Sequence, residues 1–328
     1  MNMAAEPKIK TIGVLTSGGD APGMNAAIRA VVREGINRGM KVKGIYQGYK
    51  GLLNEEFVDM DARSVSDTIS RGGTILYTAR CAQMRTPDGQ KAAADVCRRH
   101  GIEGLVVIGG DGSFAGAEKL SEQGINTVGV PGTIDLDIAC TDYTIGFDTA
   151  INTAMEAIDK VRDTSTSHER CSIIEVMGRN AGYIALWCGI ANGSEDILLP
   201  ETYDYDEQKL INNIIDCRKR GKRHHIIINA EGIGHSSSMA RRIEAATGVE
   251  TRATILGHMQ RGGSPTCRDR VFGSMMGAYA ADLLADGKTN RVVGFYHGEY
   301  VDFDISEALA MQKHLPEDMV RVSKALSI

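Results

Sequence analysis

Three glycine-rich turns carry acidic residues that could take part in phosphate chemistry. They span residues 16–20, 109–113 and 131–135, and each follows an apolar run. Glycine lets the backbone approach a phosphate closely, and the N-terminus of a following helix offers free N–H groups and positive potential. One Gly-Gly-Asp alone is more simply a turn with an aspartate that caps a helix. Three such turns at successive strand ends favour a phosphate site.

The aspartates of these turns suit the two acidic roles of phosphoryl transfer. That reaction needs a metal ion held by carboxylate and a carboxylate that accepts the proton of the attacking hydroxyl. Asp111 suits the metal because it follows a strand in a Gly-rich turn, and Asp135 suits the base. Asp135 and Asp137 are separated by one residue, so a locally extended backbone would project both to the same side. A helix cap or a solvated acid is the simpler explanation of a lone aspartate, but the grouping argues against it.

Arginines supply candidate partners for phosphate, because the guanidinium group is planar, stays protonated and can bind bidentately. Those in Gly- or Asp-rich surroundings are Arg80, Arg85, Arg170, Arg179, Arg252 and Arg261. Composition does not choose among them, and most arginines are ordinary solvated side chains. The segment 257–265 differs, because His258 and Arg261 precede a Gly-Gly turn and form a candidate anion pocket.

The elements that must position these residues alternate between strands and helices. Largely apolar runs predict strands that are buried on both faces, at residues 12–16, 105–108, 127–130, 173–176, 226–228 and 292–295. Apolar residues at 3/4 spacing predict amphipathic helices over 24–36 and 151–161. This alternation predicts a doubly wound α/β fold, with two sheets and a change of domain near residues 140–150.

Composition sets limits on the kind of protein. The 328 residues carry a formal charge of −5, with 42% hydrophobic and 24% charged residues, which is typical of a globular chain with no basic surface for nucleic acid or membrane. The seven cysteines are scattered and odd in number, which indicates reduced thiols in a cytoplasmic protein. No signal peptide, membrane span or zinc-type spacing is expected. The Gly-Lys-Thr at 287–289 lacks the rest of a Walker A motif and is expected to be a polar turn.

Together these motifs resemble the bacterial ATP-dependent 6-phosphofructokinases. The Gly-Gly-Asp-Gly motif alone is weak evidence for this family, since NAD kinases and diacylglycerol kinases carry a similar motif. The combination of all the motifs in this order is specific for the family. The matching stretches are 13–25, 108–113, 131–135, 175–179 and 256–263, within a match from about residue 9 to the C-terminal strands. The resemblance implies Mg²⁺-dependent transfer of the ATP γ-phosphoryl group to the 1-hydroxyl of fructose 6-phosphate, in glycolysis. It also implies two Rossmann-like three-layer α/β/α domains: a larger ATP-binding domain (1–146 plus 260–310) and a smaller sugar-phosphate domain (147–259 plus 311–328).

The resemblance also assigns roles to individual positions. Catalysis would involve Asp135 as general base, with Thr133, Arg179 and Arg80. Asp111 would hold the metal, and ATP would contact Gly19, Arg80, Cys81, Gly110, Asp111, Gly112 and Ser113. The sugar phosphate would contact Thr133, Asp135, Asp137, Arg170, Met177, Gly178, Arg179, Glu231, Arg252, His258 and Arg261. Arg170 and Arg252 would reach the 6-phosphate from a neighbouring subunit, so the expected assembly is a homotetramer with shared active sites.

A regulatory site is also implied, for a phosphorylated effector at a subunit interface. The matching residues are Arg29, Arg33, Asp67, Arg162, Glu195, Arg220, Lys222 and His224. The family's basic residue near Asp61 is Ala62 here, with Arg63 one position on. The alternative explanation is that these basic residues only form solvated surfaces and bind no effector.

Two further features concern the phosphoryl donor and the base. Pyrophosphate-using relatives carry Asp at Gly112 and Lys at Gly132, so the two glycines favour ATP. The family usually has Asn at Leu136, and in an extended segment this leucine would point away from the site and pack on the core. The alternatives left open are a pyrophosphate-dependent enzyme, another Gly-Gly-Asp-Gly kinase such as an NAD kinase, and a catalytically weak sugar-phosphate-binding paralogue.

Overall fold

The computed structural model describes residues 6–204 and 206–327. The chain divides into a larger unit, Met1–Ile134, Ile138–Thr149 and Arg261–Lys313, and a smaller unit, Asp135–Asp137, Ala150–Gln260 and His314–Ile328. It therefore passes between the units at 149/150, 260/261 and 313/314, beside the boundaries of 146/147, 259/260 and 310/311 that the resemblance implies. The short segment Asp135–Asp137 groups with the smaller unit.

In the larger unit, the described residues form a seven-stranded sheet in the order β11-β10-β5-β4-β1-β2-β3. The central strands are parallel, and β3 and β11 pair antiparallel at the two edges. The strands are β1 (Thr11–Thr16), β2 (Lys41–Ile45), β3 (Phe57–Met60), β4 (Gly104–Gly109), β5 (Asn126–Pro131), β10 (Arg291–Tyr296) and β11 (Glu299–Asp304).

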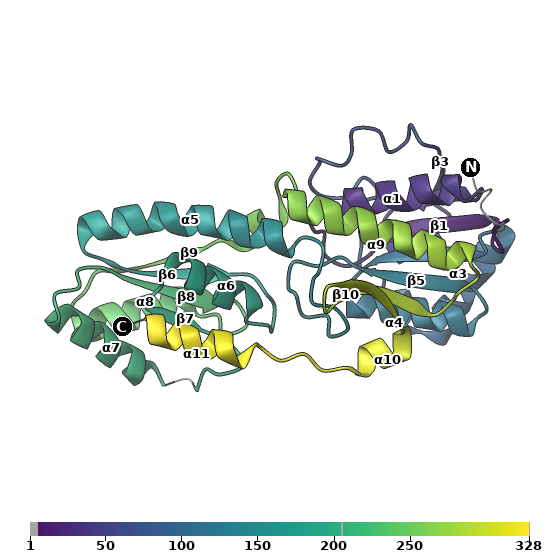
Figure 1. Cartoon of the computed structure of the whole chain (residues 1–328). Coiled ribbons are helices and arrows are strands. Elements are labelled where there is room, and N and C mark those ends of the chain that lie inside the picture. The colour runs from purple at the N-terminus through teal and green to yellow at the C-terminus, as the bar shows by residue number, and fades with distance from the viewer. Residues whose placement is uncertain (1–5, 205, 328) are drawn as a thin grey trace. The chain divides into compact units, whose positions relative to one another are not determined.

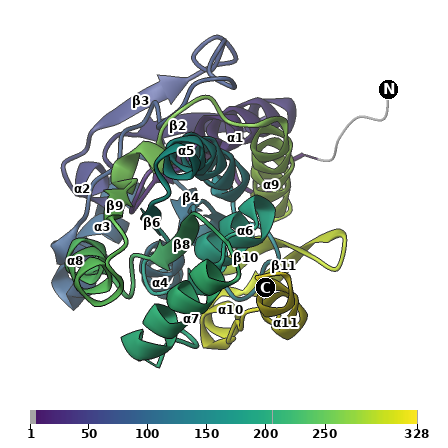
Figure 2. The ribbon, with the colours of Figure 1, turned by 90° about the vertical axis from the view of Figure 1, so that its left-hand side faces the viewer.

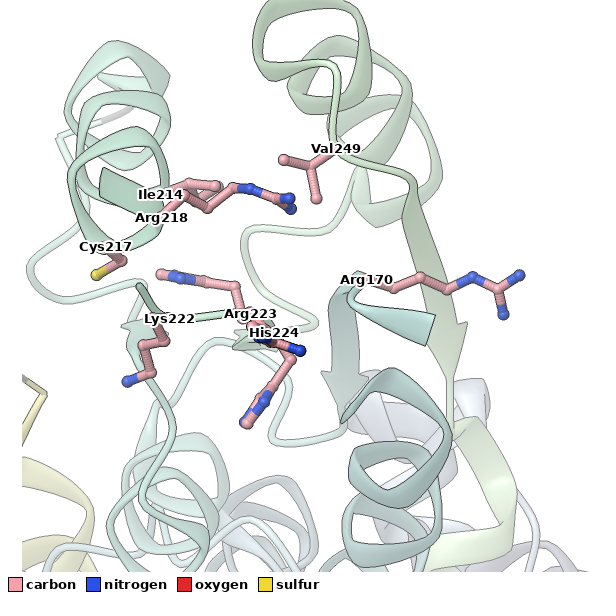
Figure 3. Close-up of a pocket in the computed structure, with 9 residues that line it drawn as sticks. Arg170, Ile214, Cys217, Arg218, Lys222, Arg223, His224 and Val249 are labelled. Atoms are coloured by element: carbon pink, nitrogen blue, oxygen red, sulfur yellow. The ribbon is translucent and has the colours of Figure 1, made fainter. Parts of the chain in front are cut away.

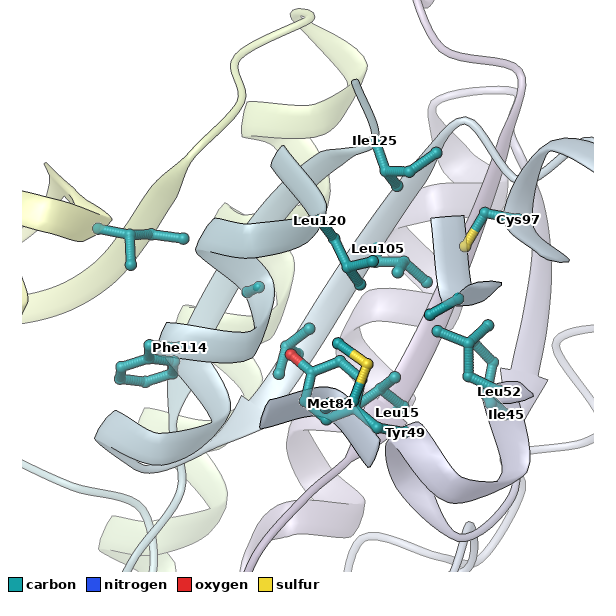
Figure 4. Close-up of a cluster of buried hydrophobic side chains, with 14 of the residues drawn as sticks. Leu15, Ile45, Tyr49, Leu52, Met84, Cys97, Leu105, Phe114, Leu120 and Ile125 are labelled. Carbon is teal, nitrogen blue, oxygen red and sulfur yellow. The ribbon is translucent and has the colours of Figure 1, made fainter. Parts of the chain in front are cut away.

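Helices cover both faces of this sheet (Figure 1). They are α1 (Met24–Asn37), α2 (Gly48–Leu53), α3 (Pro87–Arg99), α4 (Asp111–Glu122), α9 (Cys267–Ala285) and α10 (Ile305–Ala310), with a 3₁₀ turn at Ala82–Arg85. α1 and α9 lie side by side on one face, where a Cβ added to Gly277 would come within 2.5 Å of the Ala27 carbonyl. On the other face, α2, α3, α4 and α10 close a buried cluster that includes Leu15, Tyr49 and Phe114 (Figure 4).

The smaller unit has a four-stranded parallel sheet within the described residues, in the order β7-β8-β6-β9. Its elements are α5 (Phe147–His168), which begins in the larger unit, β6 (Cys171–Val176), α6 (Tyr183–Asn192), β7 (Asp196–Leu198), α7 (Glu207–Lys219), β8 (His225–Ala230), α8 (Ser236–Thr247), β9 (Thr251–Ile255), a 3₁₀ turn (Gly257–Arg261) and α11 (Glu317–Leu326). α7 and α8 pack on one face, and α5 and α6 lie on the other (Figure 2).

The fold agrees with the predicted doubly wound α/β class. Each of the six predicted runs lies in a strand, and the two predicted helices are α1 and α5. Strands β2, β3, β7, β9 and β11 were not predicted. All seven cysteines are free, and residues 287–289 follow the end of α9 as an irregular turn, as expected.

Candidate active site

The three glycine-rich turns meet at the carboxyl edge of the larger sheet. β1 lies between β2 and β4, so the chain order reverses between β1 and β4, which is where open α/β sheets bind ligands. Ser17 N donates to Ile108 O (2.9 Å), and Gly132 N donates to Gly109 O (2.9 Å). The structure therefore brings together three turns that are spread over residues 16–135 of the sequence.

The second turn leads directly into α4 and fits a nucleotide phosphate. Gly110 is the N-cap and Asp111 the first helical residue, so the aspartate is not the helix cap that the simpler explanation required. Gly110 and Gly112 have ordinary backbone angles, and a Cβ on either would meet no heavy atom within 4 Å. The protein's own packing therefore does not require glycine at these two positions. Room for a ligand to approach the backbone closely is one physical reason for glycine here.

This turn also fits a magnesium ion that arrives with a nucleotide. Mg²⁺ in such sites is held by one or two carboxylates together with substrate phosphate oxygens. Asp111 supplies one exposed carboxylate at a helix N-terminus. Among the described residues there is no group of three or more His, Cys, Asp or Glu side chains that could hold a metal without a substrate.

A loop that carries Arg80 and Cys81 is tied to the first turn. Thr78 Oγ1 donates to Gly18 O (2.8 Å), and Thr16 Oγ1 donates to Tyr77 O (2.7 Å). Arg80 is exposed, and Cys81 is half-buried against the core cluster. The loop is therefore fixed close to Arg80, while its guanidinium remains accessible.

Arg261 contacts the first turn although it lies 241 positions away in the sequence. Its Nη1 donates to Asp20 O (3.0 Å), and a Cβ on Gly19 would lie 2.7 Å from the same nitrogen. Gly19 thus leaves space that the Arg261 side chain fills, and the guanidinium lies beside the turn rather than in solvent.

Gly132 has a different explanation from the one the sequence suggested. A Cβ at this position would lie 2.9 Å from Ile108 Cγ2 and 3.1 Å from Met24 Cε. Core packing is therefore sufficient reason for glycine here, and Gly132 does not by itself indicate room for a nucleotide. The steric argument for the phosphoryl donor rests on Gly112.

The segment that carries the candidate base is not extended, contrary to the sequence-based expectation. Leu136 has φ of +57°, in the left-handed region, so Asp135 and Asp137 do not project as neighbours on one side of a strand. Asp135 is 5% exposed and Leu136 is also buried, as expected for the leucine. Asn adopts left-handed angles more readily than Leu, which explains physically why the family's Asn suits this position.

Leu136→Asn is expected to have a small effect, because two contributions oppose each other. Left-handed backbone costs a leucine about 1–2 kcal/mol, whereas burying its side chain contributes about 1.5–3 kcal/mol. We expect the free energy of unfolding to fall by about 1 kcal/mol and kcat to stay within about threefold, since Leu136 already adopts the required conformation. Urea denaturation and steady-state kinetics measure both. A tenfold rise in kcat would show instead that leucine compromises the base.

The smaller unit gathers a second set of predicted residues at the carboxyl edge of its sheet. Met177, Gly178 and Arg179 follow β6, Glu231 follows β8 and His258 follows β9, and these strands are parallel neighbours. The Glu231 carboxylate accepts hydrogen bonds from Gly178 N (3.2 Å) and Arg179 N (2.5 Å). Arg179 has φ of +56° and an exposed side chain. Glu231 therefore holds the strained turn that presents Arg179.

Sequence reasoning missed the buried polar residues beneath this edge. Gln260 is fully buried, and its Oε1 accepts a hydrogen bond from Met177 N (2.8 Å). Asn229 Nδ2 donates to Gly234 O and Ser236 Oγ, and Ser236 Oγ donates to Glu175 Oε2 (2.6 Å). Gln260 lies inside the 256–263 motif, and its place there could have marked it as a residue of the site. Asn229 stands in an apolar strand, where its polarity was the signal.

Arg170 and Arg252 lie at the opposite edge of the smaller sheet. Arg170 immediately precedes β6, and Arg252 is the second residue of β9. Both pair with Glu250: Arg170 Nε lies 2.8 Å from Oε2, and Arg252 Nη2 lies 2.6 Å from Oε1. Interaction with Arg170 and then with Arg252 lowers the pKa of the Glu250 carboxyl. Within the smaller unit, the two arginines are therefore not brought together with Met177, Glu231 and His258.

The residues predicted for an effector divide between the units. Arg29 and Arg33 lie on α1 and Asp67 on an exposed turn of the larger unit. In the smaller unit, Lys222 Nζ lies 2.7 Å from Oε1 of the buried Glu195. Burial lowers the pKa of His224, Glu195 opposes that shift, and the positive charges of Arg162 and Lys222 lower the pKa further.

A basic pocket lies beside these residues (Figure 3). Its cationic and imidazole lining comes from Arg170, Arg218, Lys222, Arg223, His224 and His225. Arg220, which caps α7, donates to Cys217 Sγ (3.3 Å). The amino edge of the smaller sheet therefore concentrates positive charge, as an anion site requires.

Comparison with known proteins identifies the family. The phosphofructokinase family model matches residues 11–284. The chain belongs to the phosphofructokinase family. An ATP-dependent 6-phosphofructokinase of Clostridium botulinum (strain Loch Maree) is 58% identical over 319 residues, which are 97% of this chain and all of that protein. One from Clostridium tetani is 57% identical over the same length.

Solved phosphofructokinases share the fold. The structure of phosphofructokinase from Saccharomyces cerevisiae has a TM-score of 0.83 and 34% identity, and it matches 97% of this chain but only 46% of the yeast chain. A pyrophosphate-dependent phosphofructokinase from Marinobacter aquaeolei has a TM-score of 0.84 at 23% identity, covering 94% of this chain and 86% of that one. The latter likeness concerns the fold alone. In the part of the chain that is described, no helix is long and apolar enough to span a membrane.

Proposed function

We propose that this phosphofructokinase transfers the γ-phosphoryl group of ATP to the 1-hydroxyl of fructose 6-phosphate, giving fructose 1,6-bisphosphate and ADP. The observation that carries the proposal is the meeting of three glycine-rich turns at the switch point of the larger sheet, with the buried Asp135 on the segment that leaves the third turn. The 58% identical relative named for the same activity supports it.

The residues of the chain have distinct parts in this reaction. The N-terminus of α4, with Ser113 in its first turn and the glycines beside Asp111, binds the ATP phosphates, and Arg80 is a further proposed contact. Asp111 is the residue that would hold Mg²⁺, which neutralises charge on the phosphates when it is bound. Asp135 accepts the proton of the 1-hydroxyl as the new oxygen–phosphorus bond forms and the bond to ADP breaks.

The contacts proposed for the sugar phosphate are the residues that the resemblance assigns to it. They are Thr133, Asp135, Asp137 and Arg261 and, at the carboxyl edge of the smaller sheet, Met177, Gly178, Arg179, Glu231 and His258. Because Arg170 and Arg252 lie at the other edge of that sheet, we assign them to the 6-phosphate of a neighbouring subunit. We propose a homotetramer with shared active sites, as the resemblance implies, and light scattering of the purified protein measures its subunit number.

An effector site is the second proposed ligand site. The amino edge of the smaller sheet, with Lys222 and His224, carries the positive charge, and Arg29 and Arg33 of a neighbouring subunit would add to it. The expected ligand is a phosphorylated metabolite, and the proposal covers both an activator and an inhibitor. The free, scattered cysteines fit a cytoplasmic enzyme of glycolysis.

A coupled assay with fructose 6-phosphate tests the proposed function. We expect fructose 1,6-bisphosphate to form with ATP and Mg²⁺, with activity lost on EDTA addition and restored by Mg²⁺. Turnover with pyrophosphate instead of ATP would identify a pyrophosphate-dependent enzyme. Phosphorylation of NAD would identify an NAD kinase, and binding of fructose 6-phosphate without turnover would identify a catalytically weak paralogue.

A further inference from the structure

A fully buried carboxylate lies where α5 begins, and none of the roles above uses it. Asp269 of α9 has no exposed surface. Its Oδ1 accepts hydrogen bonds from Tyr143 Oη (2.6 Å) and Gly146 N (2.7 Å), and its Oδ2 accepts them from Thr149 N (2.8 Å) and Thr149 Oγ1 (2.5 Å). A buried charge is tolerated only with such partners. All four donors come from one short segment, so the carboxylate holds that segment in place.

The segment, residues 143–149, leads into α5 and includes its first residues. The first N–H groups of a helix have no partner within the helix, and a negative charge there is also favoured by the helix dipole. Asp269 meets both needs from a different helix. Thr266, the N-cap of α9, adds to the same contact, because its backbone N donates to Thr149 Oγ1 (3.0 Å).

The same segment ends the loop that carries the proposed base. Residues 133–144 contain no helix or strand, and Gly132 and Ile145 form an isolated bridge that closes the loop. Ile145 N also donates to Pro131 O (2.9 Å). One end of the loop is therefore held by the sheet, and the other end by Asp269.

Close packing against residues 21–23, which follow the first glycine turn, reinforces this end of the loop. Gly146 has φ of +108°, and a Cβ there would lie 2.6 Å from the Ala21 Cβ. A Cβ on Gly23 would lie 3.2 Å from the Asp269 Cβ and 2.7 Å from Ile145 Cγ2. The residues that lead from the first turn into α1 thus pack against this end of the loop and against Asp269.

We propose that Asp269 is a positioning residue for phosphoryl transfer, whose carboxylate fixes the C-terminal end of the 132–146 loop and thereby the place of Asp135. The inference rests on the proposed function, because Asp135 is the base only in that reaction. A misplacement of about 1 Å costs up to a hundredfold in rate. A looser loop should therefore lower kcat while Asp135 itself is unchanged.

Asp269→Asn tests the proposal in the full-length enzyme. The amide keeps the size of the side chain but places an NH₂ group against donors, so part of the four-bond arrangement is lost. We expect kcat to fall about tenfold and the KM for ATP to change less than about twofold, since Asp111 and its glycines lie on α4. Hydrogen exchange of the amides in 143–149 should become faster.

A pair of variants at Thr149 gives a finer test if Asp269→Asn does not fold. Thr149→Val removes the hydroxyl that donates to Asp269 and accepts from Thr266 N, and it should lower kcat by about threefold. Thr149→Ser keeps both the hydroxyl and the backbone donor and should restore kcat to the wild-type value. A purely structural role would not produce this difference at equal melting temperature.

Val96→Ala is the matched control for lost stability. Val96 is a buried residue of α3 that no proposed role uses, and its truncation should lower the melting temperature without lowering kcat. The proposal is overturned if Asp269→Asn lowers kcat no more than Val96→Ala, or if exchange in 143–149 is unchanged. Wild-type protein without kinase activity would instead overturn the proposed function. The exchange measurement would still test whether Asp269 holds residues 143–149 in place.

Discussion

Replacing Asp135 with alanine is expected to lower kcat by about a thousandfold, with the KM for fructose 6-phosphate changed less than about fivefold. General-base catalysis by a positioned carboxylate contributes about 10²- to 10⁴-fold, and Asp135 is held almost fully buried, at 5% exposure. Asp135→Asn should lose nearly as much activity, because it keeps the shape and removes only the proton acceptor. Steady-state kinetics give kcat and KM, and calorimetric titration shows whether the sugar phosphate still binds.

Asp142 of the same loop offers a matched control. Its carboxylate accepts a hydrogen bond from His297 N (2.9 Å), and no proposed role uses it. Asp142→Asn should leave kcat within about twofold of wild type. An Asp135→Ala protein with undiminished kcat would remove the base from the mechanism, whereas an equal loss in both variants would indicate a general disturbance of the loop.

The central strands could be predicted because they are buried on both faces. β4 and β8 are buried at every residue; the sequence of β4 is a continuous apolar run, and that of β8 is apolar over residues 226–228. β2 alternates lysine with apolar residues, and β3, β9 and β11 lie at sheet edges with exposed positions. Such strands lack a continuous apolar signal and are held by pairing with their neighbours. Their existence therefore depends on tertiary contacts that a local pattern does not contain.

The proposed site could be predicted to a similar degree. The glycine turns and their aspartates are local in sequence, and the switch point brings them together as parallel strand ends must. The left-handed backbone of Leu136 was not predictable, because leucine disfavours it and only the surrounding structure imposes it. Asp269 was not predictable either, since its hydrogen-bond partners lie 120–126 positions away.

Gly112→Asp is expected to reduce kcat/KM for ATP by about a hundredfold while the protein stays as stable as wild type. Gly112 is exposed, its backbone is not left-handed, and a Cβ would meet no heavy atom within 4 Å, so the fold accepts a side chain. A nucleotide bound at this turn would be repelled by the added carboxylate. Two like charges about 5 Å apart repel by about 3 kcal/mol at an effective dielectric constant near 20, which corresponds to roughly a hundredfold in affinity.

Two companion variants separate the possible causes of that loss. Gly112→Ala adds volume without charge and should cost less than about tenfold, and Ala115→Asp adds the same charge at an exposed position of α4 three residues further on and should leave ATP kinetics within about threefold. Gly132→Lys would not serve, because its Cβ would collide with Ile108 and disturb the core. Unchanged ATP kinetics in Gly112→Asp would mean that the α-phosphate does not approach this turn. The choice of ATP over pyrophosphate would then have to come from another part of the chain.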